Sequence, residues 1–389
     1  MPVSPFARLE KLLDGEQPGG SIIDLTIGEP RHPMPDFVIP ALAEAEAGFA
    51  KYPAIRGTKE FRAAVSDWLG RRYPPLARLD PKALGIIPLA GTREGLFYVT
   101  FSACARRPEL QNPAILVPNP FYHTYAAAGA SGAELVLLRA GAETGFLPDL
   151  NAIEGSLLDR TVAMIICTPT NPQGTVANTD YLTHAIELAR KHDFILVADE
   201  CYSEIYTSSP PPGALETAWQ NSGSLANVIS MQSLSKRSNL PGLRAGYCTG
   251  DPEFIELFAS FRNVVAPQLP VPIQHACCKI LADEAHVEAN RALYREKFEA
   301  ADRILGNRYG YRRPEGGFFL WLNVNDYGDS ESVVKTLWKG CGVKLLPGNY
   351  LARSGTDGLN PGDGFIRVAM VQDLATTEDA LTRIVETLK

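Results

Sequence analysis

A lysine lies among small and hydroxylic residues at the end of a predicted buried strand. The segment Ser233-Leu-Ser235-Lys236 follows the apolar run 228–232, and Arg244 stands between two glycines eight residues beyond the lysine. A free lysine titrates at about 10.4, whereas acid–base chemistry near neutral pH needs roughly 7 to 8. Desolvation or a neighbouring cation lowers an amine's pKa in this way, and Schiff-base formation is a second use of such a lysine. A lone Ser-x-Ser-Lys is more often a surface loop, and the Gly-x-Arg-x-Gly spacing favours the chemical role.

Two other polar segments follow predicted strands upstream. Asp199-Glu-Cys-Tyr202 comes directly after the run 194–198, and Asn171, in Thr-Asn-Pro-Gln-Gly, follows the run 161–167. Ligands of open parallel sheets gather at the carboxyl ends of the strands. Taken singly, the first segment is equally typical of a helix cap and the second of an ordinary turn.

A third segment, Gly91-Thr92-Arg93, follows the run 85–89 and opens a predicted helix. Backbone N–H groups at the first turn of a helix bind phosphate groups. Turns of this kind are common in α/β proteins, so this one indicates a phosphate site only in combination with the lysine and the two other segments.

The elements that position these residues alternate between short apolar runs and helical patterns. Continuous apolar runs separated by helices indicate a mostly parallel sheet covered on both faces, which is an α/β fold. The predicted strands are 85–89, 114–117, 134–138, 161–167, 194–198 and 228–232, and the predicted helices between or beside them include 94–104, 122–130, 179–192 and 252–262.

The pattern changes after this unit to a long charged helical stretch, 271–308, followed by short strands and helices. This is typical of a smaller α+β unit. We therefore expect a large domain over residues 46–268, and a small domain formed by 269–389 together with the N-terminal arm, 1–45.

Composition narrows the class of protein. The chain has 389 residues and a formal net charge of -7, which argues against a nucleic-acid binder. The seven cysteines form no CxxC pair and the six histidines show no ligand spacing, so we expect neither a disulfide framework nor a metal site. No long apolar run predicts a membrane span, and the start of the sequence lacks a secretory pattern. We expect a cytoplasmic protein.

Taken in order along the chain, these motifs resemble those of the class I/II, or fold-type I, pyridoxal-phosphate aminotransferases, from about residue 20 onward. The resemblance implies pyridoxal 5′-phosphate as cofactor, held as a Schiff base on Lys236. It implies that Asp199 pairs with the pyridine nitrogen and that Tyr202 and Asn171 contact the ring's O3′ oxygen. The phosphate contacts that it implies are Gly91, Thr92, Arg93, Ser233 and Arg244.

The same resemblance assigns further residues. Tyr122, in Asn-Pro-Phe-Tyr, would stack on the ring, although it is otherwise an ordinary core aromatic. Tyr52 would reach the phosphate of a neighbouring subunit, which implies a homodimer with shared active sites. Arg367 would bind the substrate α-carboxylate through its planar fork, and Gly28 would allow close approach of the backbone. The substrates would be an amino acid and a keto acid.

Segments 27–33, 118–122, 199–206 and 233–244 together resemble bacterial succinyldiaminopimelate aminotransferases. That resemblance implies amino transfer between glutamate and N-succinyl-2-amino-6-oxopimelate. Both substrates carry a distal carboxylate, for which Arg31, Arg56 and Arg237 are candidate partners, although each could instead pair with a surface glutamate.

Other readings stay open. Segment 261–270 lacks the tyrosine and histidine associated with succinyldiaminopimelate aminotransferases. Other class I aminotransferases, of the aspartate, alanine or LL-diaminopimelate type, and a C–S β-lyase therefore remain alternatives. A regulator with this fold is a third reading, but such proteins typically carry an N-terminal DNA-binding domain, and only about 20 residues precede the first motif.

Overall fold

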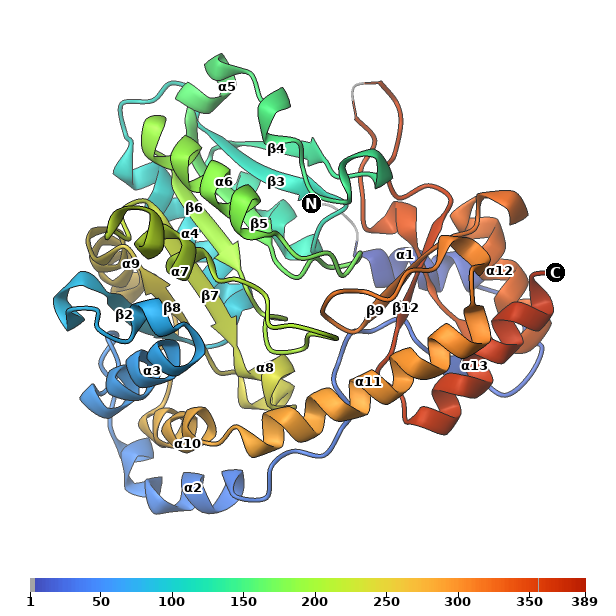
Figure 1. Cartoon of the computed structure of the whole chain (residues 1–389), viewed down its shortest axis with the longest axis horizontal. Helices are drawn as coiled ribbons and strands as arrows, with labels where there is room; N and C mark the ends of the chain where they lie inside the picture. The colour runs from blue at the N-terminus through green and yellow to red at the C-terminus, as the bar shows by residue number, and fades with distance from the viewer. Residues whose placement is uncertain (1–3, 356) are drawn as a thin grey trace.

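The computed structural model describes residues 4–355 and 357–389. Its centre is a seven-stranded sheet of order β2-β8-β7-β6-β5-β3-β4, in which β8 runs antiparallel to both neighbours and the other pairs are parallel (Figure 1). The predicted α/β fold is therefore confirmed. The strands are β2 (Gly85–Leu89), β3 (Ala114–Asn119), β4 (Glu134–Arg139), β5 (Thr161–Cys167), β6 (Ile195–Asp199), β7 (Val228–Ser233) and β8 (Gly246–Gly250).

The central strands are apolar on both faces because both faces are covered. Along β6, Ile195 and Val197 belong to one hydrophobic cluster and Leu196 and Ala198 to the other. Alternate residues of a strand point to opposite faces, so a continuous apolar run supplies both cores. The first cluster includes residues of α4 (Thr92–Arg106) and α9 (Pro252–Val265); the second includes residues of α3 (Lys59–Arg72), α6 (Thr179–Lys191), α7 (Ala214–Ser222) and α10 (Val271–Ala282).

Several predicted elements differ in detail. The segment predicted as a helix over 122–130 is a 3₁₀ helix, His123–Ser131, and the stretch 271–308 is two helices, α10 and α11 (Ala285–Leu305). The elements β8, α5 (Gly155–Asp159), α7 and the one-turn helix α8 (Leu234–Arg237) were not predicted. Strand β8 contains two glycines within five residues, which hides its strand pattern.

The remaining elements form a second, smaller unit. Its sheet has the antiparallel order β11-β12-β9, and β1 pairs in parallel with β10 nearby. Helix α1 packs against β11 and α12, so the N-terminal helix lies on this unit. Its elements are α1 (Pro5–Leu13), β1 (Ile23–Asp24), β9 (Phe319–Asn323), α12 (Ser330–Cys341), β10 (Val343–Lys344), β11 (Leu346–Pro347), β12 (Phe365–Ala369) and α13 (Leu374–Thr387).

Two helices lie close to the predicted domain boundaries. Helix α2 (Val38–Glu44) packs against α10, and α10 packs against α3. The division into 46–268 and 1–45 with 269–389 remains a proposal, and this packing favours grouping α2 and α10 with the large sheet. Helix α11 then extends from beside α8 toward α13, across both units (Figure 1).

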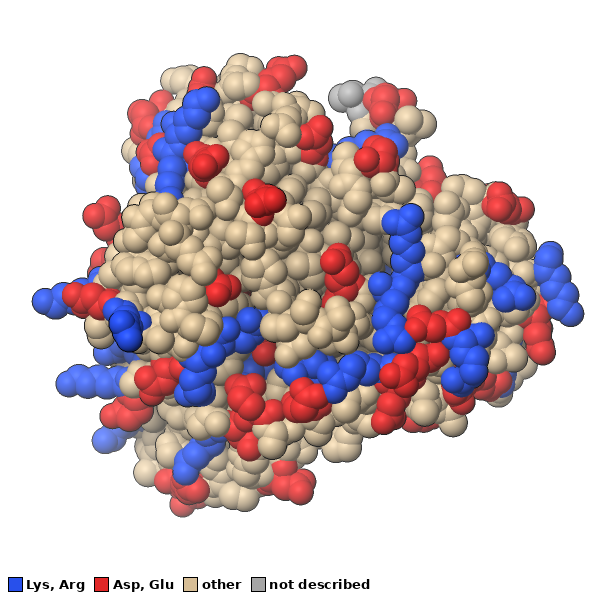
Figure 2. Space-filling view, in the orientation of Figure 1, with Lys and Arg blue, Asp and Glu red and all other residues tan. Residues whose placement is uncertain are grey.

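The surface carries intermixed charges. Figure 2 shows basic and acidic side chains side by side on this face, many of them in its lower half. On α11, for example, Glu288 pairs with both Arg291 and Arg295. Within the described residues, no helix is both long and apolar enough to cross a membrane.

Candidate active site

A cavity of about 480 Å³ lies where β5, β6 and β7 end, and segments from both units line it. Asn171 follows β5, Asp199 ends β6 and Ser233 ends β7, as the parallel order requires. Most residues singled out in the sequence meet here. Those lining the cavity are Gly28, Thr92, Arg93, Tyr122, Asn171, Asp199, Tyr202, Ser233, Lys236, Arg244 and Arg367.

Lys236 opens onto this cavity from α8. Its Nζ donates a hydrogen bond to the carbonyl of Gly28 and lies 5.3 Å from the ring centroid of Phe318. Burial lowers the pKa of Lys236 to about 8, and the positive charges of Arg367 and Arg244 contribute in the same direction. A neutral amine is therefore accessible close to physiological pH, which is the state that a nucleophile or base requires.

Asp199 is a buried carboxylate held by two donors. The hydroxyl of Tyr125 donates to Oδ2 at 2.6 Å, and the backbone N–H of Cys201 donates to Oδ1 at 3.3 Å. Burial raises the pKa of Asp199, and these hydrogen bonds oppose the rise. Tyr125 was not predicted from the sequence, although it lies three residues after Tyr122 and thus one helical turn along the same segment.

In Arg367, on β12, both Nη atoms donate hydrogen bonds to the protein. Its Nη1 donates to Oδ1 of Asn171 at 3.1 Å, and its Nη2 donates to the carbonyl of Thr26 at 2.6 Å. The Nδ2 of Asn171 in turn donates to the Tyr202 hydroxyl at 3.4 Å. The Nε of Arg367 is buried without a partner among the described residues, and burial lowers the pKa of Arg367 to about 10. A buried cation with a free donor is suited to an anionic ligand.

A second group of hydrogen-bond donors lies at the start of α4. Gly91, with φ of 87°, is the N-cap of this helix, and a Cβ there would stand 2.4 Å from Nη2 of Arg244. A Cβ at this position would therefore displace the end of the Arg244 side chain, and the positive φ also favours glycine. The hydroxyl groups of Thr92, Ser233 and Ser235 belong to the same cavity. Helix N–H groups, hydroxyls and an arginine form a donor set that suits a phosphate.

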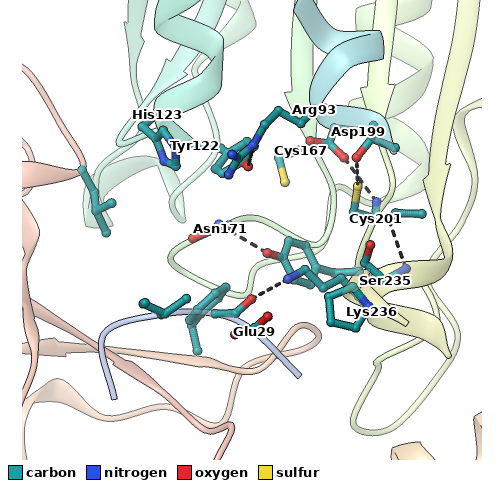
Figure 3. Close-up of a pocket in the computed structure, with 18 of the residues that line it drawn as sticks. Glu29, Arg93, Tyr122, His123, Cys167, Asn171, Asp199, Cys201, Ser235 and Lys236 are labelled. Atoms are coloured by element: carbon teal, nitrogen blue, oxygen red, sulfur yellow. Dashed lines mark hydrogen bonds between the residues drawn. The ribbon is translucent and has the colours of Figure 1, made fainter. Parts of the chain in front are cut away.

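The opposite wall is aromatic. Figure 3 shows Tyr122 and His123 together with Arg93 across the cavity from Lys236 and Glu29. The Nε of Arg93 donates to the Tyr122 hydroxyl at 3.0 Å. Burial and the charges of Arg93 and Arg367 lower the pKa of His123 to about 4, so this imidazole is neutral at pH 7.

Five residues singled out in the sequence do not line the cavity of their own chain, and one of them is Gly91, which lies against Arg244 instead. Tyr52 is fully exposed, and Arg31 is exposed as well. Arg56 forms an ion pair with Glu256 at the surface. Arg237 is buried and donates to Glu284 and to the carbonyl of Ile280.

Sequence reasoning also missed residues that do line the cavity. Cys201 lies between the predicted Asp199 and Tyr202, so its position in the motif was the available signal. Ile27, Glu29, His123, Ser235 and Pro241 likewise lie within or beside the quoted motifs, whereas the remaining four residues carry no such signal. The missed residues are Phe6, Ile27, Glu29, His123, Cys167, Cys201, Ser235, Pro241, Phe319 and Leu351. No group of three or more His, Cys, Asp or Glu side chains in the described ranges is arranged to hold a metal ion.

The fold and cavity together define a pyridoxal-phosphate-dependent transferase of fold type I. The model of the family "Aminotransferase class I and II" matches residues 20–384, and the chain therefore belongs to this family. Its members depend on pyridoxal 5′-phosphate, and they move amino groups between amino acids and keto acids.

Known proteins resemble the chain over its whole length. It is 31% identical to an LL-diaminopimelate aminotransferase of Nitratidesulfovibrio vulgaris, over 99% of this chain and 96% of the relative. An aminotransferase structure from Neisseria meningitidis superposes with a TM-score of 0.93 and 37% identity, covering 100% of this chain and 98% of that one. A probable N-succinyldiaminopimelate aminotransferase from Thermus thermophilus gives 0.85 and 26%, covering 99% and 100%.

The chemistry of the cavity fits this cofactor. An amine of lowered pKa matches its aldehyde, a buried carboxylate matches a protonated ring nitrogen, and the donors at α4 with Arg244 match a phosphate dianion. Arg367 also lines the cavity, and its charge suits a separate carboxylate.

The lowered pKa of Lys236 predicts the reactivity of the cofactor-free protein. Acetylation of Lys236, followed by mass spectrometry, should rise with pH and level off above about pH 8, because the neutral amine is the reactive form. In urea the same lysine should titrate at about 10.4. A native profile that still rises above pH 10 would contradict the desolvated environment.

Proposed function

We propose that Lys236 is the catalytic residue of this aminotransferase. Its Nζ would hold the cofactor, and as a free amine it would accept the proton that leaves the substrate Cα. Pyridoxal phosphate, when bound, supplies the electron sink that allows this proton to leave. The lowered pKa of Lys236 supports the proposal, because a base with a pKa near the working pH transfers protons efficiently.

We propose that different residues around Lys236 bind different parts of the cofactor. Asp199 would pair with the ring nitrogen, and the Tyr125 hydrogen bond would orient that carboxylate. Tyr202 and Asn171 would contact the phenolic oxygen, and Tyr122 would lie against the ring. The phosphate would be held by Gly91, Thr92, Arg93, Ser233 and Arg244.

Arg367 and Gly28 complete the proposed site on the substrate side. Arg367 would bind the α-carboxylate through its unpartnered edge, and the hydrogen bonds to Asn171 and Thr26 hold its plane in place. The backbone at Gly28 packs closely on Phe319, since a Cβ there would stand 2.4 Å from Cζ of that ring, and it would lie beside the same carboxylate. A carboxylate fixed in this way presents the Cα of the amino acid to Lys236.

We propose glutamate and N-succinyl-2-amino-6-oxopimelate as the substrates. The support is the set of four motif segments and the likeness to the Thermus protein named for the succinylated substrate. The Nitratidesulfovibrio relative is named for LL-diaminopimelate, which makes that amino acid the second candidate. Arg31 and Arg56 are exposed and remain our candidates for the distal carboxylate, although Arg56 pairs with Glu256 at the surface. Arg237 is the weakest candidate, because it is buried and paired with Glu284.

A half-reaction screen tests the substrate. The cofactor-loaded enzyme is mixed with single amino acids, and conversion of the cofactor to its amine form is followed by absorbance. We expect glutamate and N-succinyl-LL-diaminopimelate to react fastest. For both, Arg367→Gln should lower the second-order rate constant by about 100-fold, the loss expected for a buried charged hydrogen-bonding pair.

Each other outcome of the screen has a defined meaning. Fastest conversion by free LL-diaminopimelate would replace the succinylated substrate with the second candidate. Release of pyruvate and ammonia from cystathionine without a keto acid would contradict amino transfer altogether and favour a β-lyase.

We propose that the enzyme is a homodimer in which Tyr52 reaches the cofactor phosphate of the partner. Tyr52 is fully exposed in the single chain, and the large apolar side chains Phe49 and Val264 are exposed as well. Exposed apolar groups of this size favour a covering partner, and a second copy of the chain is the partner that Tyr52 requires.

Mixed dimers test the shared site. Lys236→Ala and Tyr52→Ala, each weakly active alone at limiting cofactor, should together recover about a quarter of wild-type activity after unfolding and refolding as a mixture, because half the dimers then carry one intact site. Tyr327→Ala, which replaces another exposed tyrosine, is the control and should keep full activity. A monomer in sedimentation, or no recovery on mixing, would contradict the shared site.

A further inference from the structure

A buried polar face of α11 lies behind the lysine. Asn290, Tyr294 and Lys297 are spaced by four and three residues, so they share one side of the helix, and each is at most 3% exposed. Among the described residues, no carboxylate pairs with the Lys297 ammonium. A buried lysine without a directly paired carboxylate is unfavourable, and within the described part of the chain only the charges of Asp373 and Glu296, beyond ion-pair distance, favour its protonation.

A chain of hydrogen bonds leads from Lys297 to the lysine of the active site. The Nζ of Lys297 lies 2.6 Å from Nε2 of His32 and donates to the carbonyl of Met370 at 3.1 Å. The Nδ1 of His32 lies 2.7 Å from Oδ1 of Asn290. The Nδ2 of Asn290 donates to the carbonyls of Lys236, at 3.2 Å, and Arg237, at 3.3 Å.

The ammonium group of Lys297 determines which atom donates and which accepts in each hydrogen bond of this chain. An ammonium group has donors only, so Nε2 of His32 must accept and Nδ1 must carry the hydrogen. His32 then donates to Oδ1 of Asn290, which leaves the amide nitrogen to donate to the two carbonyls. Burial lowers the pKa of His32 and lowers that of Lys297 to about 8, so a neutral imidazole beside the cation is the expected state.

The chain ends at carbonyls that would otherwise lack partners. Lys236 and Arg237 are the last two residues of α8, and the final carbonyls of a helix have no partner within the helix. The amine of Lys236 meanwhile donates to the carbonyl of Gly28, four residues before His32. The N-terminal segment 28–32 therefore holds Lys236 at both its backbone and its amine.

Aromatic rings fill the space between the two lysines. Tyr294 stacks on Phe318, with centroids 5.3 Å apart and an interplanar angle of 17°. The Nζ of Lys236 lies 5.3 Å from the Phe318 centroid, and the Nζ of Lys297 lies 5.0 Å from the Tyr294 centroid. The Tyr294 ring also lies against His32, with centroids 4.5 Å apart, so the stack shields part of the hydrogen-bonded chain from water.

We propose that Lys297, His32 and Asn290 are positioning residues that hold the Lys236 backbone so that its amine stays in the desolvated position beside Gly28. None of the three lines the cavity. The contact of Lys297 with Met370, three residues after Arg367, ties the strand of the carboxylate-binding arginine to the same chain. The inference rests on the proposed role of Lys236, but its first test measures the cofactor-free protein.

The test compares Asn290→Ala with a matched control, Gln274→Ala. Gln274 is also a fully buried amide, which donates to the carbonyl of Leu269 and accepts from the N–H of Thr58, and it does not line the cavity. The pH profile of Lys236 acetylation is measured on each folded apoprotein, and urea unfolding gives the stability of each.

We expect Asn290→Ala to raise the apparent pKa of Lys236 by about one unit, because the amine gains solvent when its backbone is released. Asn290→Leu, which keeps the size of the side chain but cannot donate to the carbonyls and adds no charge, should do the same. Gln274→Ala should lose comparable stability without this shift. Lys297→Met should shift the profile in the same direction, and Lys297→Arg should restore it toward wild type.

With cofactor bound, Asn290→Ala should lower the half-reaction rate constant about tenfold with little change in the concentration of amino acid that gives half the maximal rate. A Lys236 profile unchanged in both Asn290 variants, at reduced stability, would show that the chain only supports the fold and would overturn the inference. This result would leave the role of Lys236 itself untouched.

Discussion

The candidate site depends on several cationic side chains that lie together in one cavity. Lys236, Arg244 and Arg367 line the same space, and Asp199 is the buried carboxylate among its lining residues. Burial lowers the pKa of Lys236 to about 8, and the charges of Arg367 and Arg244 add to this effect. Such an arrangement is unfavourable by itself and becomes favourable when anions enter. The cavity is therefore organised around a phosphate and a carboxylate, with a neutral amine available between them.

The order of the strands brings these side chains together. Three adjacent parallel strands end at one edge and deliver the lysine segment, the aspartate and the asparagine. The antiparallel sheet of the smaller unit brings Arg367 from the other side, where Asn171 joins the two units by accepting its hydrogen bond. Helix α11 then supports the lysine from behind through Asn290. Because the site draws on both units, a change in their packing would move the carboxylate-binding arginine relative to the amine.

The sequence predicted the parallel sheet and most of the cavity because each motif directly follows an apolar strand, so the topology itself brings the motifs together. It failed where position depends on long-range contacts. Arg237 follows the lysine in sequence yet points away from the cavity to Glu284, and His32 meets Asn290, 258 residues away. Strand β8 was missed because glycine is uncommon in strands. The break between α10 and α11 was missed because residues 283–284 are neither proline nor glycine, so the sequence does not mark it.

The central claim is that one amine, on Lys236, is the point of covalent attachment of pyridoxal phosphate. Borohydride reduction of the loaded enzyme, followed by proteolysis and mass spectrometry of the peptides, tests it most directly. The account predicts a single reduced adduct on the peptide that contains Lys236, and none in Lys236→Ala. An adduct on another lysine, or wild-type turnover in Lys236→Ala, would contradict it.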